Sequence, residues 1–255
     1  WRTWDHDGRE WFKKNCGRGL ASNLHGGTTS PWSHALSMMP REEDGAPLPL
    51  HAVLCINLED RPQRLQRFLA SARWHGLEET TSRFPAVDGR GLDLDDFPRS
   101  VVVEAGVRMA RRPPKVVNGV SLTRGALGLI LTWHALLQQI AGDACHEHVY
   151  LVCEDDATFN PDFVHRLRAS LAEADSLEPK WDLIHVGYYD DDCALRNLVG
   201  TNGAGGHLLC RPVVVYGLFG AALRPLGAQK LLKWLFPLTE QIDSGLSHVY
   251  NHVRA

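Results

Sequence analysis

Three consecutive carboxylates, Glu154, Asp155 and Asp156, form the strongest chemical signal in the sequence. They follow the apolar run 149–153, which predicts a strand that ends abruptly at the acids. In open α/β sheets, ligands bind just outside the carboxyl ends of the strands. Carboxylates that repel one another at such a place favour a hard divalent cation, Mg²⁺ or Mn²⁺, held together with substrate phosphates. The alternative is a solvated turn that caps the next helix.

Polar residues also stand at the ends of two other predicted strands. The apolar run 52–58 contains Asn57 and is followed by Arg61, and the run 82–87 is closed by Asp88. A plain turn is the alternative for Asp88. For the arginines of the next helix the alternative is a solvated face, which fits Arg64 better than Arg61.

These residues are positioned by a regular alternation of predicted strands and helices. Thr123 is a suitable N-cap for the second helix, and the pair Asn160 and Pro161 is suitable for opening the third. The alternation from residue 51 onward predicts one α/β domain with a mostly parallel central sheet. The predicted strands are 52–58, 82–87, 149–153, 181–187 and 213–223, and the predicted helices are 61–74, 123–141, 160–177 and 227–236.

Residues 1–50 differ from the rest of the chain. Four tryptophans are scattered there among Gly, Ser, Asn and Pro, with little apolar periodicity. We therefore expect an irregular, Trp-rich N-terminal arm at 1–50, followed by the α/β domain at 51–255. The tryptophans are expected to pack on that domain or on a partner, because aromatic rings bury a large area.

Composition excludes several classes of function. The 27 Lys and Arg residues are balanced by 30 Asp and Glu, so the chain lacks the strong positive field that nucleic-acid binding depends on. No stretch reaches the ~18 consecutive apolar residues of a membrane span. The six cysteines include no C-x-x-C pair, which argues against zinc ribbons and thioredoxin-like redox motifs.

Several blocks in a fixed order resemble glycosyltransferase family 25, which includes procollagen galactosyltransferases and bacterial lipooligosaccharide galactosyltransferases. The resemblance covers roughly residues 52–247. Singly most blocks are weak, but their order and spacing are specific. The blocks are 56–58 with Arg61 and Arg64, 86–90, 122–125 with Gly128, 152–156, and 181–184 with Val186 and Gly187, followed by the weaker 227–232 and Pro237 with Ile242 and Asp243.

The resemblance implies a GT-A-like fold that uses a nucleotide sugar, usually UDP-galactose, with Mn²⁺ bridging the diphosphate. Asp156 is then expected to ligate the metal directly, and Glu154 to contact the ribose or a metal-bound water. Asp155 belongs to the same acidic motif. Asn57 and Arg61 would lie at the uridine, ribose or diphosphate, and Asp88 at the nucleoside. The implied reaction is inverting transfer of a hexose, galactose or glucose, from a UDP-sugar to a hydroxyl acceptor.

Inverting transfer needs a general base that takes the proton of the acceptor hydroxyl. Asp243 matches the late acidic position of the family and is our candidate; its alternative role is a helix cap. The sequence departs from the family where Ala126, Trp133 and Ser244 replace polar residues. These departures favour an alternative, a non-catalytic GT-A-like domain that serves as a binding or interaction module.

The acceptor is left open as a protein, a glycan or a lipid, because acceptor loops vary most. The compartment is equally open: the lumen of the secretory pathway for a eukaryotic protein, the cytoplasm for a bacterial one.

Overall fold

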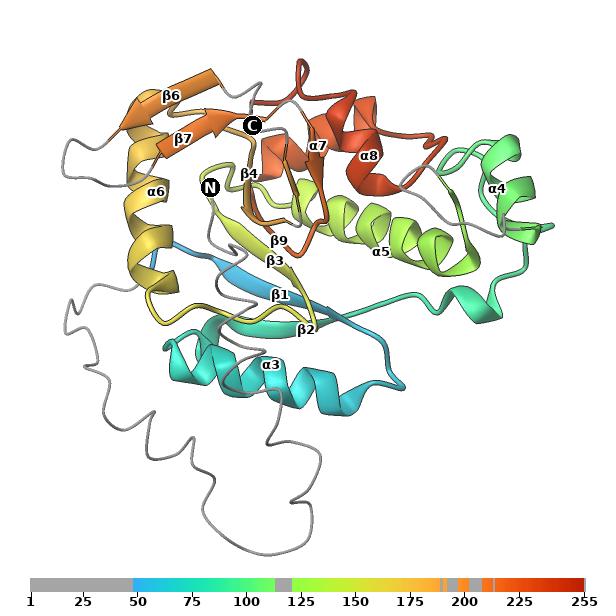
Figure 1. The fold of residues 1–255 in the computed structure, drawn as a ribbon, viewed down its shortest axis with the longest axis horizontal. Coiled ribbons are helices and arrows are strands. Elements are labelled where there is room, and N and C mark those ends of the chain that lie inside the picture. Colours follow the sequence, from blue (N-terminus) through green and yellow to red (C-terminus); the bar gives the residue numbers. More distant parts are fainter. Residues whose placement is uncertain are drawn as a thin grey trace, which may run out of the picture. The chain divides into compact units, whose positions relative to one another are not determined.

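A five-stranded sheet forms the centre of the computed structural model (Figure 1). The structure describes residues 48–112, 121–188, 190–191, 197–201, 208–212 and 214–254, and for 190–191, 197–201, 208, 210 and 211 it describes the backbone alone. The arm predicted for 1–50 therefore lies outside the described residues, except for 48–50. The body described here begins at Pro49.

The sheet has the order β2-β1-β3-β9-β4. Strand β1 is parallel to β2 and to β3, whereas β9 is antiparallel to both β3 and β4. Four of the five strands thus point the same way, which confirms the prediction of an α/β fold with a mostly parallel sheet. The bounds are β1 Ala52–Asn57, β2 Thr81–Pro85, β3 Tyr150–Glu154, β4 Leu183–Gly187 and β9 Gly220–Leu223.

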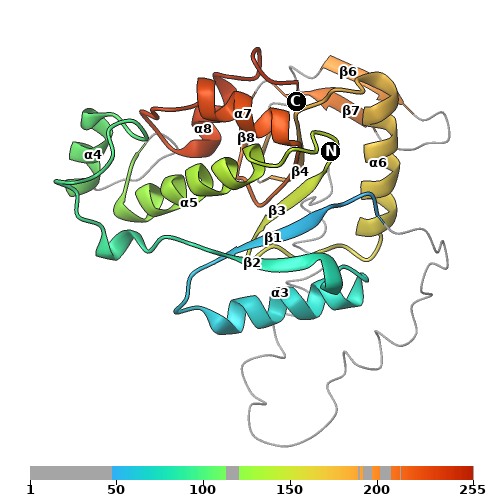
Figure 2. The same ribbon diagram turned by 180° about the vertical axis from the view of Figure 1, so that it is seen from behind.

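Helices cover both faces of this sheet (Figures 1 and 2): α3 lies on one side, and α5 and α7 on the other. β1 and β3 are continuously buried because both faces are covered. Leu54 and Ile56 of β1 join the core beneath α5 and α7. The helices are α3 Pro62–Trp74, α4 Glu104–Arg111, α5 Arg124–Ala141, α6 Phe163–Leu177, α7 Pro225–Trp234 and α8 Ile242–Ser247, with short 3₁₀ turns η1 Glu78–Thr80 and η2 Gly89–Gly91.

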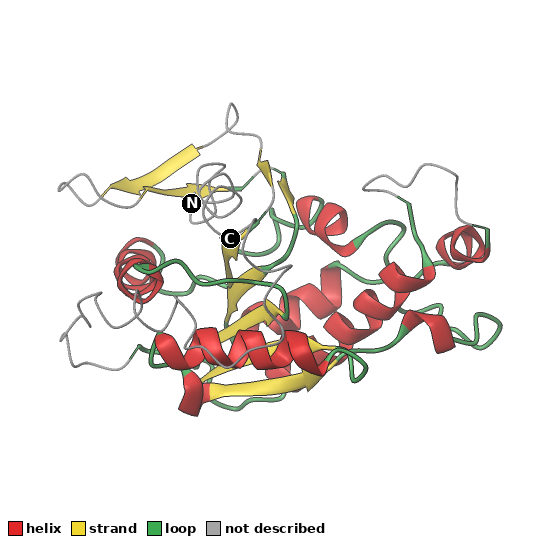
Figure 3. Cartoon of the chain, turned by 60° about the horizontal axis from the view of Figure 1, so that its bottom comes forward, coloured by secondary structure: helices red, strands yellow, loops and turns green. Residues whose placement is uncertain are grey.

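The segment after β4 differs from the sequence prediction. One strand was expected over 213–223, but the chain forms a short β8, Val215–Tyr216, and then β9, with Gly217 between them at a φ of 81°. Only glycine adopts this left-handed conformation without strain, so it breaks the apolar run in two. β8 pairs with β5, Asp190–Asp191. A further pair, β6 Asn197–Thr201 with β7 Leu208–Arg211, stands away from the main sheet (Figure 3).

Gly128 allows α5 to approach the chain that follows β2. A Cβ added to Gly128 would lie 2.5 Å from the Val87 carbonyl oxygen, so no larger residue fits there. Thr132, one turn later, accepts a hydrogen bond from the Val87 N–H (2.8 Å). Thr123 caps the helix as predicted, through a bond from the Ala126 N–H to its Oγ1 (3.1 Å). The opening of α6 is different, because its N-cap is Asp162 and not Asn160.

No helix in the described part of the chain combines the length and apolarity that crossing a membrane requires.

Candidate functional site

The three acids lie together at the carboxyl end of β3. Glu154 is the last residue of the strand, and Asp155 and Asp156 form the turn that follows. The side chain of Asp155 is 11% exposed and that of Asp156 is 53% exposed. Asp156 is therefore the more open of the two aspartates, and its place as the direct metal ligand stays a prediction.

Asn57, at the end of β1, holds the acidic turn in place. It is 2% exposed, and its Nδ2 donates to Asp155 Oδ2 (2.7 Å) and to the Arg61 carbonyl (3.0 Å). Its Oδ1 accepts a hydrogen bond from Arg83 Nε (3.1 Å). A carboxamide has two N–H donors, and the protein uses both. In this geometry Asn57 positions Asp155 and the start of α3.

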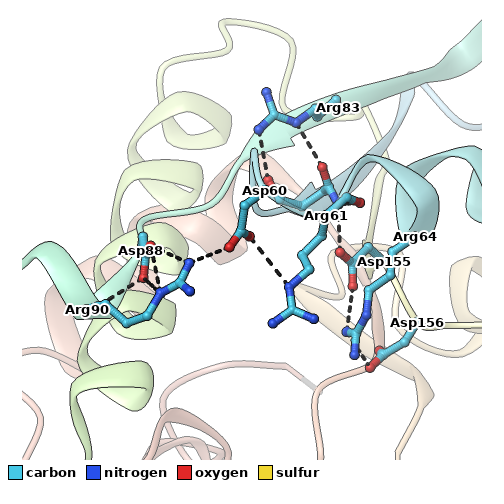
Figure 4. Close-up of polar contacts among 9 residues, drawn as sticks. Asp60, Arg61, Arg64, Arg83, Asp88, Arg90, Asp155 and Asp156 are labelled. Carbon is cyan, nitrogen blue, oxygen red and sulfur yellow. Dashed lines mark hydrogen bonds and ion pairs between the residues drawn. The ribbon is translucent and has the colours of Figure 1, made fainter.

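Arg64 is the cation that faces the acids. Its Nη1 lies 3.2 Å from Asp155 Oδ1 and 3.2 Å from Asp156 Oδ2, so one guanidinium bridges both carboxylates (Figure 4). The hydrogen bond to Asp155 raises the pKa of Arg64. The sequence left a solvated helix face as the alternative for the arginines and fitted it better to Arg64 than to Arg61. In the structure, the side chain of Arg61 is the more exposed of the two, at 51% against 40%, and Arg64 contacts the acids.

Glu154 experiences strong electrostatic repulsion. Burial, and then the charges of Asp156, Asp155 and Asp243, raise the pKa of its carboxyl to about 8. A free glutamate side chain ionises near pH 4.5, so burial and the neighbouring charges favour the protonated form of this carboxyl at neutral pH, and its ionised form would be repelled. A bound cation would relieve that repulsion.

Asp243 is brought to this edge of the sheet from the far end of the sequence. It lies in the first turn of α8, and its Oδ2 accepts a hydrogen bond from the Gly217 N–H (2.9 Å) while its Oδ1 accepts one from the Ser244 N–H (2.9 Å). Its charge acts on Glu154. Next to Gly217, Tyr216 is 45% exposed, an aromatic surface that the sequence pattern did not single out.

Asp88 and Arg61 belong to a chain of charged groups beside the acids (Figure 4). Arg90 donates to both oxygens of Asp88 and to Asp60 Oδ2 (2.5 Å), and Asp60 lies 3.5 Å from Arg61. The hydrogen bonds from Arg90 lower the pKa of Asp88 to about 2. The side chain of Arg61 is 51% exposed, so its guanidinium is open to solvent. Arg90 was not selected by the sequence analysis.

Two of the departures from the family pattern have structural roles. Trp133 is 3% exposed and belongs to the hydrophobic core. Ser244 is buried in α8 and donates its N–H to Asp243. Trp133 thus fills the core, and Ser244 supports the candidate base through its backbone.

Comparison with known proteins agrees with the family resemblance of the sequence blocks, although no family model matches the chain. A probable inactive glycosyltransferase 25 family member 3 of Rattus norvegicus is 29% identical over 192 residues, 74% of this chain and 32% of that protein. A glycosyltransferase 25 family member of Aedes aegypti is 30% identical over 154 residues, 60% of this chain and 23% of that protein. This chain resembles the glycosyltransferase 25 family.

Procollagen galactosyltransferase 2 of Mus musculus is also similar, at 25% identity over 208 residues, 78% of this chain and 30% of that protein. The resemblance predicted from the sequence blocks is thereby confirmed. The chain spans about a third or less of the length of these relatives. One of them is named as a galactosyltransferase and another as probably inactive.

Proposed function

We propose that this domain transfers a hexose from a UDP-sugar to a hydroxyl acceptor, with inversion and with the help of a divalent metal ion, on a GT-A-like fold. The observation that carries the proposal is the convergence of Glu154, Asp155 and Asp156 with Asp243 at the carboxyl edge of the sheet. A plain turn or a helix cap has no need of a fourth carboxylate that acts on the first.

The residues at this edge fit a hard divalent cation. Its acidic residues all offer carboxylate oxygens, and oxygen is the ligand atom that Mg²⁺ and Mn²⁺ prefer. Asp156 and Glu154 would hold the ion, while Asn57 fixes Asp155 beside them. When bound, the metal neutralises negative charge that develops on the diphosphate leaving group.

Arginines supply the remaining positive charge. Arg61 is exposed, and its contact with Asp60 is long at 3.5 Å, so it could turn to a diphosphate, whereas Arg64 is paired with the aspartates. An ion bound by the aspartates would compete with Arg64 and release its guanidinium toward the phosphates. Asp88 lies at the end of the same charged chain, where it would contact the nucleoside.

Asp243 is suited to act as the general base. Two backbone N–H groups hold its carboxylate in a fixed orientation. In an inverting step the acceptor oxygen forms a bond to the anomeric carbon as the bond to the diphosphate oxygen breaks, and the hydroxyl proton passes to Asp243. Tyr216 would offer the acceptor an aromatic surface next to that carboxylate.

The proposal is tested by calorimetric titration of UDP, UDP-galactose and UDP-glucose with and without Mn²⁺. We expect binding that requires Mn²⁺ and is lost in Asp156→Ala. The matched control is Asp96→Ala, which removes an exposed carboxylate of the segment before α4. Equal binding by both variants, or no binding of any UDP compound, would overturn the proposed donor site.

A non-catalytic binding domain is the second candidate, and it is favoured by the similarity to relatives named as inactive. The two candidates differ in turnover. Release of UDP from a bound UDP-sugar, abolished in Asp243→Asn, supports the transferase. Metal-dependent UDP binding without any release of UDP or transfer supports the binding domain.

A further inference from the structure

Histidine and aspartate side chains gather at the opposite, amino-terminal edge of the same sheet. His51 directly precedes β1, and Asp143 and His148 belong to the segment that joins α5 to β3. One potential ligand atom of each of these three residues lies within 4.8 Å of the other two. Sequence spacing does not connect these residues, because 92 positions separate His51 from Asp143.

Backbone structure fixes the three side chains relative to one another. The His51 N–H donates to the Val149 carbonyl (2.8 Å), which extends the pairing of β1 with β3 by one residue. The imidazole rings of His51 and His148 are stacked, with centroids 3.8 Å apart and planes inclined by 14°. Stacked imidazoles are best tolerated when they do not both carry a proton charge.

Asp143 is held by the protein around it. Its Oδ2 accepts a hydrogen bond from the Tyr150 hydroxyl (2.7 Å) and lies 2.6 Å from His148 Nδ1, and its Oδ1 accepts the Cys145 N–H (2.9 Å). These donors favour the ionised carboxylate. A carboxylate and an imidazole nitrogen are thus already in contact, and a second imidazole lies against the first.

We infer that His51, Asp143 and His148 bind a divalent transition-metal ion, with Zn²⁺ as the best fit. Two imidazole nitrogens and one carboxylate oxygen form a typical zinc ligand set, with water available for a fourth position. The ion would replace the proton shared by Asp143 and His148, and that proton would pass to solvent. Ligand atoms around tetrahedral zinc lie about 3.4 Å apart, a spacing that the exposed His51 can reach by tilting its ring.

This inference does not depend on the proposed transferase activity. His148 and Glu154 are six residues apart on the same extended segment, which places the two edges roughly 20 Å from each other. The edges also differ in chemistry, because nitrogen ligands select zinc, nickel or copper over Mg²⁺ and Mn²⁺. One protein would therefore hold two kinds of ion at opposite ends of one strand.

The test is calorimetric titration of Zn²⁺ into the full chain, free of any histidine tag and saturated with Mg²⁺, in the Asp156→Ala background. This background removes the proposed donor-site ligand, so failure of that site leaves the result intact. We expect one Zn²⁺ to bind and His51→Gln and His148→Gln each to weaken its affinity about tenfold or more. Co²⁺ should give the visible absorption of a tetrahedral site in the parent and not in either variant.

Two neighbouring residues serve as matched controls. His146→Gln removes an exposed histidine of the same segment, and Cys145→Ser removes its exposed, free thiol. Both should leave the Zn²⁺ affinity within about threefold of the parent. Absence of Zn²⁺ binding, or binding that survives both His51→Gln and His148→Gln, would overturn the inference. His51→Gln alters an exposed side chain, so it keeps the test valid even if His148→Gln unfolds the protein.

Discussion

Both ends of the central strands gather titratable side chains, but the two edges of the sheet differ in electrostatic balance. At the amino-terminal edge, Asp143 is satisfied by donors from its own segment and from Tyr150. At the carboxyl-terminal edge, burial and then three other carboxylates raise the pKa of Glu154 to about 8. Groups held under such repulsion cluster at functional sites. We therefore place the proposed catalysis at the carboxyl-terminal edge, and at the amino-terminal edge we propose ion binding without catalysis.

The largest expected effect is on transfer at the carboxyl edge. Asp243→Asn keeps the size of the side chain but removes the proton acceptor, so sugar transfer should slow by roughly 10²–10⁴-fold while UDP affinity changes little. The measurement is the rate of UDP release at a saturating concentration of the UDP-sugar. His51→Gln, at the amino edge, should leave the rate unchanged. Equal rates in Asp243→Asn and the parent would remove Asp243 from the mechanism.

The next effect is on stability and compares a buried polar residue with an exposed one. Asn57→Leu removes the buried side-chain hydrogen bonds to Asp155, the Arg61 carbonyl and Arg83, so it should lower the free energy of unfolding by about 2–3 kcal/mol. His51→Gln should stay within about 0.5 kcal/mol. Urea denaturation in the presence of a chelator measures both. Similar losses in the two variants would show that Asn57 has no special positioning role.

A pH-dependent effect distinguishes the edges further. The pKa of Glu154 lies near 8 in the folded state and near 4.5 when unfolded, so between these pH values the folded state binds a proton that the unfolded state has released. Metal-free stability should therefore fall as pH rises from 4.5 to 8. Glu154→Gln should remove this fall and stabilise the protein above pH 8 by on the order of 1–2 kcal/mol.

Thermal unfolding across pH 5–9 in chelator measures this effect, with the exposed Glu79→Gln as the matched control. Parallel stability curves for the parent and Glu154→Gln would contradict the assignment of the titration to Glu154.

Sequence patterns predicted the central strands well because a strand that is buried on both faces has a continuous apolar run in the sequence. β1 and β3 lie within one residue of their predicted bounds. The direction of β9 could not be predicted, since an apolar run contains no information on whether its neighbour is parallel. The short helices α4 and α8 were missed because each has too few residues for a helical period to stand out.

The candidate site was predictable to a similar extent. The acids at the end of β3 could be placed by rule, because ligands bind at that edge of such sheets. The roles of Asn57 and Arg64 could not, since they depend on the register of β1 with β3 and on the face that α3 turns toward the acids. The likeness to glycosyltransferase family 25 located Asp243, whereas its bond to Gly217 required the fold.

The smallest expected effect concerns Arg64, the arginine that contacts the aspartates at the carboxyl-terminal edge. Arg64 bridges Asp155 and Asp156 while 40% exposed, so its interaction with them is worth at most about 1 kcal/mol. Arg64→Gln removes this competitor for the aspartates, and the affinity for Mn²⁺ alone should rise about threefold. If the released guanidinium also contacts the diphosphate, the same variant should bind UDP with Mn²⁺ about threefold more weakly.

Arg67→Gln is the matched control on the same helix, where its Nε donates to the Gln63 carbonyl at 3.4 Å. Calorimetric titrations of Mn²⁺ and then UDP into both variants separate the two effects. Opposite changes for metal and nucleotide in Arg64→Gln alone would show that one side chain serves both the empty and the loaded site. Identical affinities in the two variants would show that Arg64 forms only a surface ion pair and affects neither metal nor nucleotide binding.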